Sequence, residues 1–427
     1  MTFDVAIIGA GPSGCMAAIA AKQSNPSLRV AIFDKNETPA HRIGEALLTG
    51  TVMALDELGI ADQIAASGYH EKIGASYVWG KSRDPWYVNY PTTTDPYPQS
   101  FMRDGMRRSI HVPRHIFDAQ LRDIASAHGV EFVFARLNDV VCSSGHVLRV
   151  MSDDGDVYRS AQWIDSTGQN ALFGRRLTER RPILSSRVAR YGYFDDLDWS
   201  RAQDAGFDPH RTNIISYEGG WCWVIHLGDK GGGLTSVGCV TTPDFAKRID
   251  VDFASHGFGA LNDFGFDRGL RLRRHDGSLS DALYAHPDYS FESLDLHGSN
   301  WSMSGDAALF LDPILSQGVT LAMHYGLLRG RAAVATLAGD DNAQAEVTRH
   351  YRNEAKVLRT VIGEWYSNNR SVDGWRLTAQ GIAEDLGLEV GGDKVKSFMS
   401  ITNLENLRAE YDPFPKSVTE HIWRHLK

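Results

Sequence analysis

The chain has 427 residues, with 44 Lys and Arg against 53 Asp and Glu, and a formal net charge of -9. This length exceeds one typical domain and predicts two domains, one of them interrupted or followed by the other. Because charges of both signs are interspersed, no nucleic-acid partner is expected. No apolar run approaches the roughly 20 residues that span a bilayer, and no signal pattern precedes the first strand. We therefore expect a cytoplasmic protein with no membrane partner.

The four cysteines are scattered, at positions 15, 142, 222 and 239. They show neither a CxxC pair nor the Cys/His spacing of a zinc site. The sequence therefore predicts no metal site and is typical of a reducing compartment.

The first fourteen residues carry the strongest motif. A buried strand over residues 3–8 runs directly into Gly-Ala-Gly-Pro-Ser-Gly and then into an Ala-rich helix. In such a turn the first glycine permits the tight bend, the second admits a pyrophosphate, and the third allows close helix packing. The helix N-terminus directs its free N–H groups at the phosphates. The predicted cofactor contacts here are Gly9, Gly11, Pro12, Ser13 and Gly14.

A second apolar strand over residues 29–33 ends in Asp34, about 20 residues beyond the last glycine of the motif. A carboxylate at this place can accept the ribose hydroxyls of an adenosine, and it favours a ribose without a phosphate. We predict that Asp34 and the adjacent Lys35 contact the cofactor.

The following segments predict a nucleotide domain in pieces. Periodicity indicates helices near residues 48–63 and 117–128, and strands near 75–79, 130–135, 161–165 and 301–304. The turn at residues 166–168 is expected to return to the nucleotide. Residues 185–296 are rich in β-branched and aromatic residues, which predicts a mostly antiparallel sheet. A long helical tail is expected from about residue 319.

Several short segments resemble one flavoenzyme family as a set. Gly305-Asp306-Ala307-Ala308 after a strand and Arg114 before a helix resemble the FAD-dependent aromatic monooxygenases. The sequence RIGEAL, beginning at Arg42, resembles the RIGE[AS] segment of the flavin-dependent halogenase-like branch, and DPILSQG, beginning at Asp312, resembles its DPxxSxG segment. The stretch YHEKIGA places Lys72 at that branch's catalytic lysine. The resemblance covers roughly residues 1–330.

The resemblance implies a fold and a set of cofactor contacts. The expected fold is α/β: a Rossmann-type FAD-binding domain (1–184 with 297–330), an inserted antiparallel β-sheet substrate domain (185–296) and a helical C-terminal region (331–427). FAD is the implied cofactor. Further contacts implied by the matching segments are Arg42, Glu45, Arg114, Asp306, Pro313 and Gly318.

Lys72 and Ser316 are the implied catalytic residues. In a hydroxylase, Lys72 would donate a hydrogen bond to the C4a-hydroperoxide of the flavin, whereas in a halogenase the same ammonium would hold hypohalous acid. The alternatives without a catalytic role are that Lys72 is a solvated lysine beside Glu71 and that Ser316 only shapes a turn.

One segment departs from the halogenase pattern. GWCWVIH, residues 220–226, keeps both tryptophans and the isoleucine of WxWxIP but has a histidine in place of the proline. Trp221, Trp223 and His226 are predicted to contact the substrate. The alternative is that the tryptophans are core aromatics and the histidine is a satisfied, partly buried side chain.

A halogenase-like chain without the full halogenase signature resembles the relatives in this branch that hydroxylate a tryptophan within a partner protein and so mature tryptophylquinone cofactors. This resemblance implies oxygen insertion. We expect an FAD-dependent monooxygenase that hydroxylates an aromatic ring, with a tryptophan of a partner polypeptide, during quinone cofactor maturation, as the favoured substrate. The alternatives are a halogenase of a phenol, pyrrole or indole, a hydroxylase of a small phenol, and a non-catalytic flavin-binding partner protein. A flavin reductase or NAD(P)H is the expected reductant.

Overall fold

The computed structural model describes residues 1–80, 84–90, 96–183, 187–247, 259–268, 270–287 and 290–367. The chain divides into two compact units, each built from separate stretches of sequence. The first unit comprises Met1–Gly44, Arg114–Leu184 and Ser290–Arg359. The second comprises Glu45–Pro113, Ser185–Tyr289 and the chain from Thr360 on.

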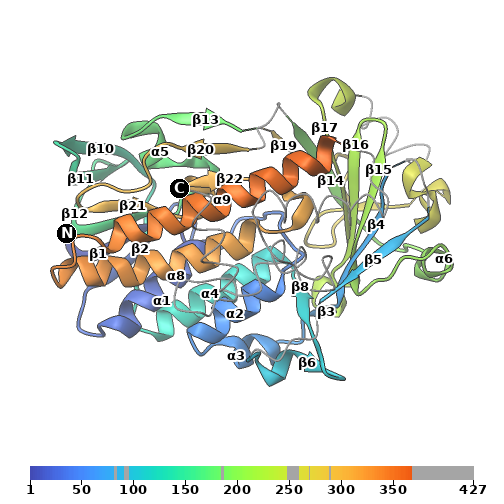
Figure 1. Cartoon of the computed structure of the whole chain (residues 1–427), viewed down its shortest axis with the longest axis horizontal. Helices are drawn as coiled ribbons and strands as arrows, with labels where there is room; N and C mark the ends of the chain where they lie inside the picture. The colour runs from blue at the N-terminus through green and yellow to red at the C-terminus, as the bar shows by residue number, and fades with distance from the viewer. Residues whose placement is uncertain are drawn as a thin grey trace, which may run out of the picture. The chain divides into compact units, whose positions relative to one another are not determined.

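A parallel sheet forms the centre of the first unit (Figure 1). Its parallel strands, in order across the sheet, are β21 (Trp301–Met303), β12 (Val157–Asp165), β1 (Thr2–Ile8), β2 (Val30–Asp34) and β9 (Glu131–Phe134). The strands β1 and β2 are joined through the helix α1 (Pro12–Ser24), as in a nucleotide-binding βαβ unit. The predicted α/β class with a Rossmann-type sheet is confirmed.

Two smaller sets of strands complete this unit. β10 (Leu137–Ser143) and β11 (His146–Ser152) extend the main sheet in antiparallel fashion beyond β12. β13 (Arg180–Pro182), β20 (Phe291–Ser293) and β22 (Leu309–Phe310) form a separate three-stranded sheet. Other helices of the unit are α4 (Arg114–Ala127), α5 (Leu172–Arg176) and α8 (Gly318–Leu337).

Helix α8 packs closely on α1, because two of its glycines lie against the α1 backbone. A Cβ atom at Gly326 would lie 2.2 Å from the carbonyl oxygen of Ser13, and one at Gly330 would lie 2.1 Å from that of Ala17. Helix α9 (Ala343–Ser367) follows α8, so the predicted helical tail is two helices through residue 367. The tail beyond residue 367 lies outside the described residues.

The second unit contains an eight-stranded sheet. Its strands are β18 (Leu272–Arg273), β14 (Val188–Phe194), β17 (Thr235–Thr241), β16 (Gly220–His226), β15 (Arg211–Tyr217), β4 (Gly74–Val78) and β5 (Trp86–Asn89), with β19 (Tyr284–Pro287) beside β14. Every pair is antiparallel except β15 with β4. The predicted antiparallel sheet is therefore confirmed, and the strand predicted at residues 75–79 joins it.

Short elements surround this sheet. They are α2 (Thr49–Glu57), α3 (Ala61–Ala65), β3 (His70–Lys72), β6 (Met102–Arg103), β7 (Met106–Arg107), β8 (Ser109–His111) and α6 (Trp199–Asp204). The single helix predicted over residues 48–63 is wrong. It is interrupted at Gly59, whose φ of 69° lies in the left-handed region that ends helices.

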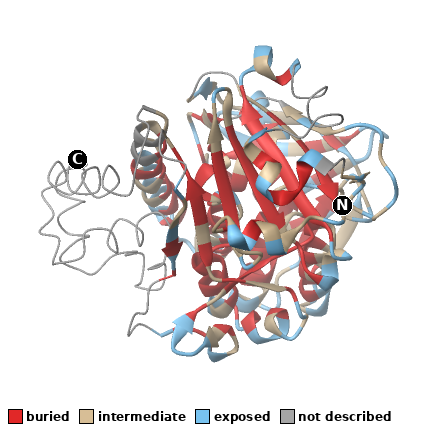
Figure 2. Cartoon of the chain, turned by 90° about the vertical axis from the view of Figure 1, so that its right-hand side faces the viewer, coloured by how far each residue is buried: buried red, intermediate tan, exposed pale blue. Residues whose placement is uncertain are grey.

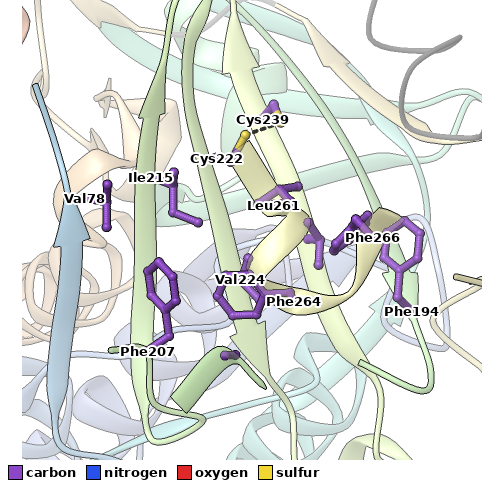
Figure 3. Packing of buried hydrophobic residues seen from close by; sticks show 12 residues of the cluster. Val78, Phe194, Phe207, Ile215, Cys222, Val224, Cys239, Leu261, Phe264 and Phe266 are labelled. Carbon is purple, nitrogen blue, oxygen red and sulfur yellow. Dashed lines mark hydrogen bonds between the residues drawn. The ribbon is translucent and has the colours of Figure 1, made fainter. Parts of the chain in front are cut away.

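The two faces of β16 have different neighbours. Cys222 and Val224 point into a core that includes Leu261, Phe264 and Phe266, which pack on the sheet in Figure 3. Because side chains alternate along a strand, the tryptophans at 221 and 223 point to the other face. Cys222 lies directly opposite Cys239 of β17, and their sulfur atoms are 2.6 Å apart. The sequence spacing of the cysteines did not predict this contact.

Buried residues run along the strands, which appear red in Figure 2. Within the described residues, no helix combines the length and the apolar character needed to cross a bilayer.

Candidate cofactor and active-site residues

The glycine-rich turn after β1 is shaped by close backbone contacts. Gly9 has a φ of 106°, and a Cβ atom there would lie 2.2 Å from the carbonyl oxygen of Ser166. A Cβ atom at Gly14 would lie 1.9 Å from the Gly9 carbonyl oxygen. Gly11 is different, since nothing lies within 4 Å of its added Cβ. Gly9 and Gly14 are thus required by the protein's own packing, while Gly11 leaves open space in front of the helix N-terminus, as a bound pyrophosphate requires.

Three buried hydroxyls join this turn to the rest of the sheet edge. The Ser13 hydroxyl lies 2.6 Å from that of Ser304 and 3.3 Å from that of Ser166. The Ser166 and Ser304 hydroxyls are 3.0 Å apart. The turn predicted at residues 166–168 therefore meets the glycine-rich turn. Ser304 was missed, because only the tertiary structure brings it to this edge.

Asp34 lies at the end of β2, as predicted, and its carboxylate is already engaged. It accepts hydrogen bonds from the backbone N–H groups of Ala10 (2.8 Å) and Asn36 (2.9 Å). Arg122 of α4 pairs with it at 3.3 Å and also donates to the Ala10 carbonyl. These contacts hold the carboxylate beside the glycine-rich turn. The neighbouring Lys35 is exposed.

Two predicted arginines lie in the same unit as Asp306. Arg114 is buried, donates two hydrogen bonds to Asp118 (2.9 and 3.0 Å) and one to the Ile43 carbonyl (2.7 Å). Arg42 is exposed. Burial raises the pKa of Asp306 to about 6, while the positive charges of Arg114 and Arg42 oppose that rise. Asp306 is therefore a partly buried carboxyl within the field of two cations.

Replacing Asp306 with Asn should change how stability depends on pH. The folded protein holds a proton on Asp306 up to about pH 6, whereas the unfolded chain releases it near pH 4, so this group's contribution to stability falls as pH rises through that window. The free energy of unfolding of Asp306→Asn relative to the wild type should rise by about 1–2 kcal/mol between pH 4 and 7. Urea unfolding of the apoprotein measures it. Asp123→Asn, an exposed position, is the control, and parallel curves for Asp306→Asn and the wild type would contradict the assignment.

The segment before α8 forms a strained turn. Asp312 caps Pro313–Leu315 by accepting the Ile314 N–H at 3.0 Å. Ser316 follows with a φ of 59°, a left-handed conformation that is uncommon for a residue with a side chain. Such strain is typical of functional turns. Apart from its chain neighbours and its own helix backbone, no described residue lies within 4 Å of a Cβ added at Gly318, the first residue of α8. The helix therefore begins at open space.

Lys72 lies in the second unit and is not a surface lysine. Its residue is only 2% exposed, and burial lowers its pKa to about 7. Within the described part of the chain, its amino group has no hydrogen bond and no ion pair; the ring of Tyr90 lies 5.9 Å from the nitrogen. A buried amino group without a carboxylate partner costs stability. The burial of Lys72 therefore favours a catalytic role over that of a solvated surface lysine.

The predicted tryptophans belong to an aromatic face of the second unit's sheet. The rings of Trp221 and Trp223 are 6.0 Å apart, and Tyr191 lies 6.1 Å from Trp223. The Trp221 indole N–H donates to the Tyr366 hydroxyl at 2.7 Å, and that of Trp223 donates to Ser236 at 3.1 Å. Both tryptophans are buried and their polar atoms are satisfied.

Two other predicted residues also have partners in this unit. Glu45 is buried and accepts a 2.7 Å hydrogen bond from the Tyr193 hydroxyl. His226 is partly buried, lies 3.3 Å from the Thr235 hydroxyl, and has its pKa lowered by burial and by His210. The His70 ring lies 4.9 Å from it. The histidines around His226 carried no motif signal and were missed by the sequence analysis.

The predicted residues thus fall into two groups. The first unit brings together the glycine-rich turn, Asp34, Arg114 and Asp306 on parallel strands and adjoining helices, and it also holds the turn at Ser316. The second unit holds Lys72, Glu45 and the tryptophan pair. A parallel sheet with a glycine-rich turn defines a nucleotide-binding unit, and the buried lysine lies in the separate unit that contains the mostly antiparallel sheet.

Comparisons with known proteins give the family. The family model described as "Tryptophan halogenase" matches residues 4–104 and 91–385. The chain belongs to this family. A curated relative, the 1H-pyrrole-2-carbonyl-[peptidyl-carrier protein] brominase of Pseudoalteromonas luteoviolacea, is 26% identical over 347 residues, covering 80% of this chain and 79% of the relative.

Solved structures show the same fold. A flavoprotein/dehydrogenase from Cytophaga hutchinsonii has a TM-score of 0.75 at 23% identity, with all of both chains covered. Halogenase PltM in complex with phloroglucinol and FAD has a TM-score of 0.71 at 18% identity, covering 94% of this chain and 83% of that one. At these identities the likeness establishes the fold.

Proposed function

We propose that this protein is an FAD-dependent halogenase that places chlorine or bromine on an electron-rich aromatic ring. The observation that carries the proposal is Lys72: it occupies the lysine position of the halogenase-like segment, and the fold buries it with no carboxylate partner among the described residues. The family match and the brominase relative support the same reaction class.

The first unit has the features that FAD requires. The open space at Gly11 and the α1 N-terminus fit a pyrophosphate, and Asp34 at the end of β2 fits the adenosine ribose. Asp306 and Arg114 would contact the ribityl and pyrophosphate groups. Pro313, Ser316 and Gly318 would lie against the flavin ring. When bound and reduced, FAD supplies the electrons that activate O2 for halide oxidation.

Lys72 would act on the halogen donor. As an ammonium it can hold hypohalous acid by a hydrogen bond and polarise it, making the halogen more electrophilic. Its pKa of about 7 means that both protonation states are accessible near neutral pH. A buried setting keeps bulk water away from the electrophile, with which it would otherwise react.

The substrate is proposed from the chemistry of the reaction. Electrophilic halogenation needs an electron-rich ring such as a pyrrole, phenol or indole. The brominase relative is named for a pyrrole carried on a peptidyl carrier protein. We propose the same substrate class here, free or tethered to a carrier, with a flavin reductase supplying reduced FAD.

The comparisons support halogenation better than the predicted hydroxylation of a protein tryptophan. The family model and the brominase relative are both named for halogenation. The histidine at position 226 therefore represents variation within a halogenase-like segment, and oxygen insertion becomes an outcome of the test.

A panel of substrates tests the proposal. The protein would be incubated with FAD, a flavin reductase, NADH, O2 and bromide, together with phloroglucinol, tryptophan or a pyrrole-2-carbonyl carrier protein, and the products analysed by mass spectrometry. We expect a bromine isotope doublet on at least one ring, and its loss when bromide is omitted. An oxygen adduct formed without halide would contradict halogenation, and FAD binding with no product from any ring would support a non-catalytic role.

A further inference from the structure

Lys72 shares one face of a short strand pair with two histidines. β3 pairs with β8 so that His70 lies opposite His111 and Lys72 lies opposite Ser109. Directly opposed residues, and residues two apart, have their side chains on the same face of an antiparallel pair. Glu71 therefore points to the other face. Lys72 and His111 are diagonal neighbours on the shared face, a distance that long side chains can bridge.

Among the described residues, the buried Ser109 hydroxyl beside Lys72 has no hydrogen-bond partner. Ser109 is fully buried, and its hydroxyl makes no hydrogen bond within the described residues. An unsatisfied buried hydroxyl is uncommon and indicates an ordered water or another polar ligand. The Lys72 amino group, the Ser109 hydroxyl and the His111 ring offer the two to four polar partners that a buried water needs.

The backbone sets which nitrogen of each neighbouring histidine carries a proton. His111 Nδ1 lies 3.0 Å from the carbonyl oxygen of residue 226, His70 Nε2 lies 3.1 Å from that of Pro209, and His210 Nδ1 lies 3.2 Å from that of Glu71. A carbonyl oxygen only accepts, so each of these nitrogens is an N–H donor. The remaining nitrogen of each neutral ring is then a proton acceptor. That of His111, Nε2, lies 3.5 Å from the Thr212 hydroxyl.

The rings form a continuous series that reaches solvent. The His111 and His70 ring centres are 5.9 Å apart, and those of His70 and His210 are 4.4 Å apart. His111 is fully buried, His70 is partly buried and His210 is exposed. Both pairs of rings are stacked, with interplanar angles of 17° and 9°, so their nitrogens lie at the ring edges. A water at the shared edge of two stacked rings would connect their nitrogens.

We propose that Lys72, His111, His70 and His210 form a proton path between the buried amino group and solvent, with Ser109 holding the water that joins Lys72 to His111. This inference rests on the proposed function, in which Lys72 acts on the halogen donor. In the transfer, the Lys72 ammonium becomes an amine and the receiving imidazole becomes an imidazolium. That imidazolium passes the proton outward until His210 releases it to water, so no other bond changes.

The charges around the path favour transfer over storage of the proton. The positive charge of Lys72 lowers the pKa of His111. The negative charge of Asp208 raises the pKa of His70, and that of Asp229 raises the pKa of His226. Burial, followed by the neighbouring His210 and His226, lowers the pKa of His70 to about 4. The His70 and His111 rings are therefore neutral at pH 7, and each carries an additional proton only transiently during transfer.

Asparagine substitutions separate proton transfer from structure. In His111→Asn and His210→Asn, the amide N–H can still donate to the same carbonyl, but no basic nitrogen remains. We expect bromination of phloroglucinol to fall roughly 100-fold in His111→Asn and about tenfold in His210→Asn, with reduced-flavin oxidation unchanged. Because His210 is exposed, added imidazole should restore the His210→Asn rate. His146→Gln, at an exposed position in the first unit, is the matched control.

The outcomes distinguish the two proposals. Wild-type rates and pH profiles in both variants would overturn the proton path while leaving the halogenase proposal intact. A slow His210→Asn that imidazole does not restore would also overturn it, because a structural defect does not respond to added base. A wild-type protein that brominates none of the rings in the panel would overturn the proposed function, and the proton path with it.

Discussion

Replacing Lys72 with Met is expected to lower halogenated product by about 10²–10⁴-fold while FAD binding and O2 consumption by reduced flavin persist. Methionine keeps the unbranched apolar shape but cannot donate a hydrogen bond to hypohalous acid. Product is measured by mass spectrometry and O2 consumption with an oxygen electrode. Lys247→Met, at a strongly exposed lysine, is the control and should retain full activity.

The same substitution should not destabilise the protein. Burial lowers the pKa of Lys72 to about 7, so between about pH 7 and 10 the unfolded chain binds more protons than the folded one, and this group's contribution to stability rises with pH. Lys72→Met should remove that rise and match or exceed the wild-type stability at pH 7, because a buried unpaired charge is lost. Full activity in Lys72→Met, or a large loss of stability, would contradict the role assigned to Lys72.

Two alanine substitutions in the glycine-rich turn should have opposite effects. Gly14→Ala places a Cβ atom 1.9 Å from the Gly9 carbonyl oxygen, so the apoprotein should lose about 3 kcal/mol or more of stability. Gly11→Ala meets nothing within 4 Å, so the apoprotein should lose at most about 1 kcal/mol. The added methyl group would instead occupy the space of the pyrophosphate and weaken FAD binding by about 10–100-fold.

Urea unfolding of the apoproteins and fluorescence titration with FAD measure these two effects separately. The Gly11 variant serves as the folded control for the Gly14 variant. Unchanged FAD affinity in Gly11→Ala would show that the cofactor does not approach this turn, and would contradict the assignment of the FAD site.

Local patterns in the sequence predicted the nucleotide-binding half of the fold well. The strand, glycine-rich turn and helix at the N-terminus form where expected, and Asp34 ends the second strand. These features depend on neighbours along the chain. Arg122, which holds Asp34, and Ser304, which lies against Ser13, come from distant segments and give no local signal.

The candidate site of the second unit was less predictable for the same reason. The lysine at position 72 could be named from its motif, but only the tertiary structure shows that it is buried. The histidines near it are separated by up to 140 positions and meet through strand pairing. The single helix predicted over residues 48–63 does not form, because the apolar periodicity continues across Gly59, whose left-handed backbone separates two helices.

The most direct test of halogenation is a reaction with bromide in an atmosphere of ¹⁸O2, followed by mass spectrometry of the aromatic product. We expect the product to carry the bromine isotope doublet and no ¹⁸O, because the oxygen atom leaves as water when the halogen joins the ring. A product that gains ¹⁸O and no bromine would contradict this account and restore ring hydroxylation as the reaction.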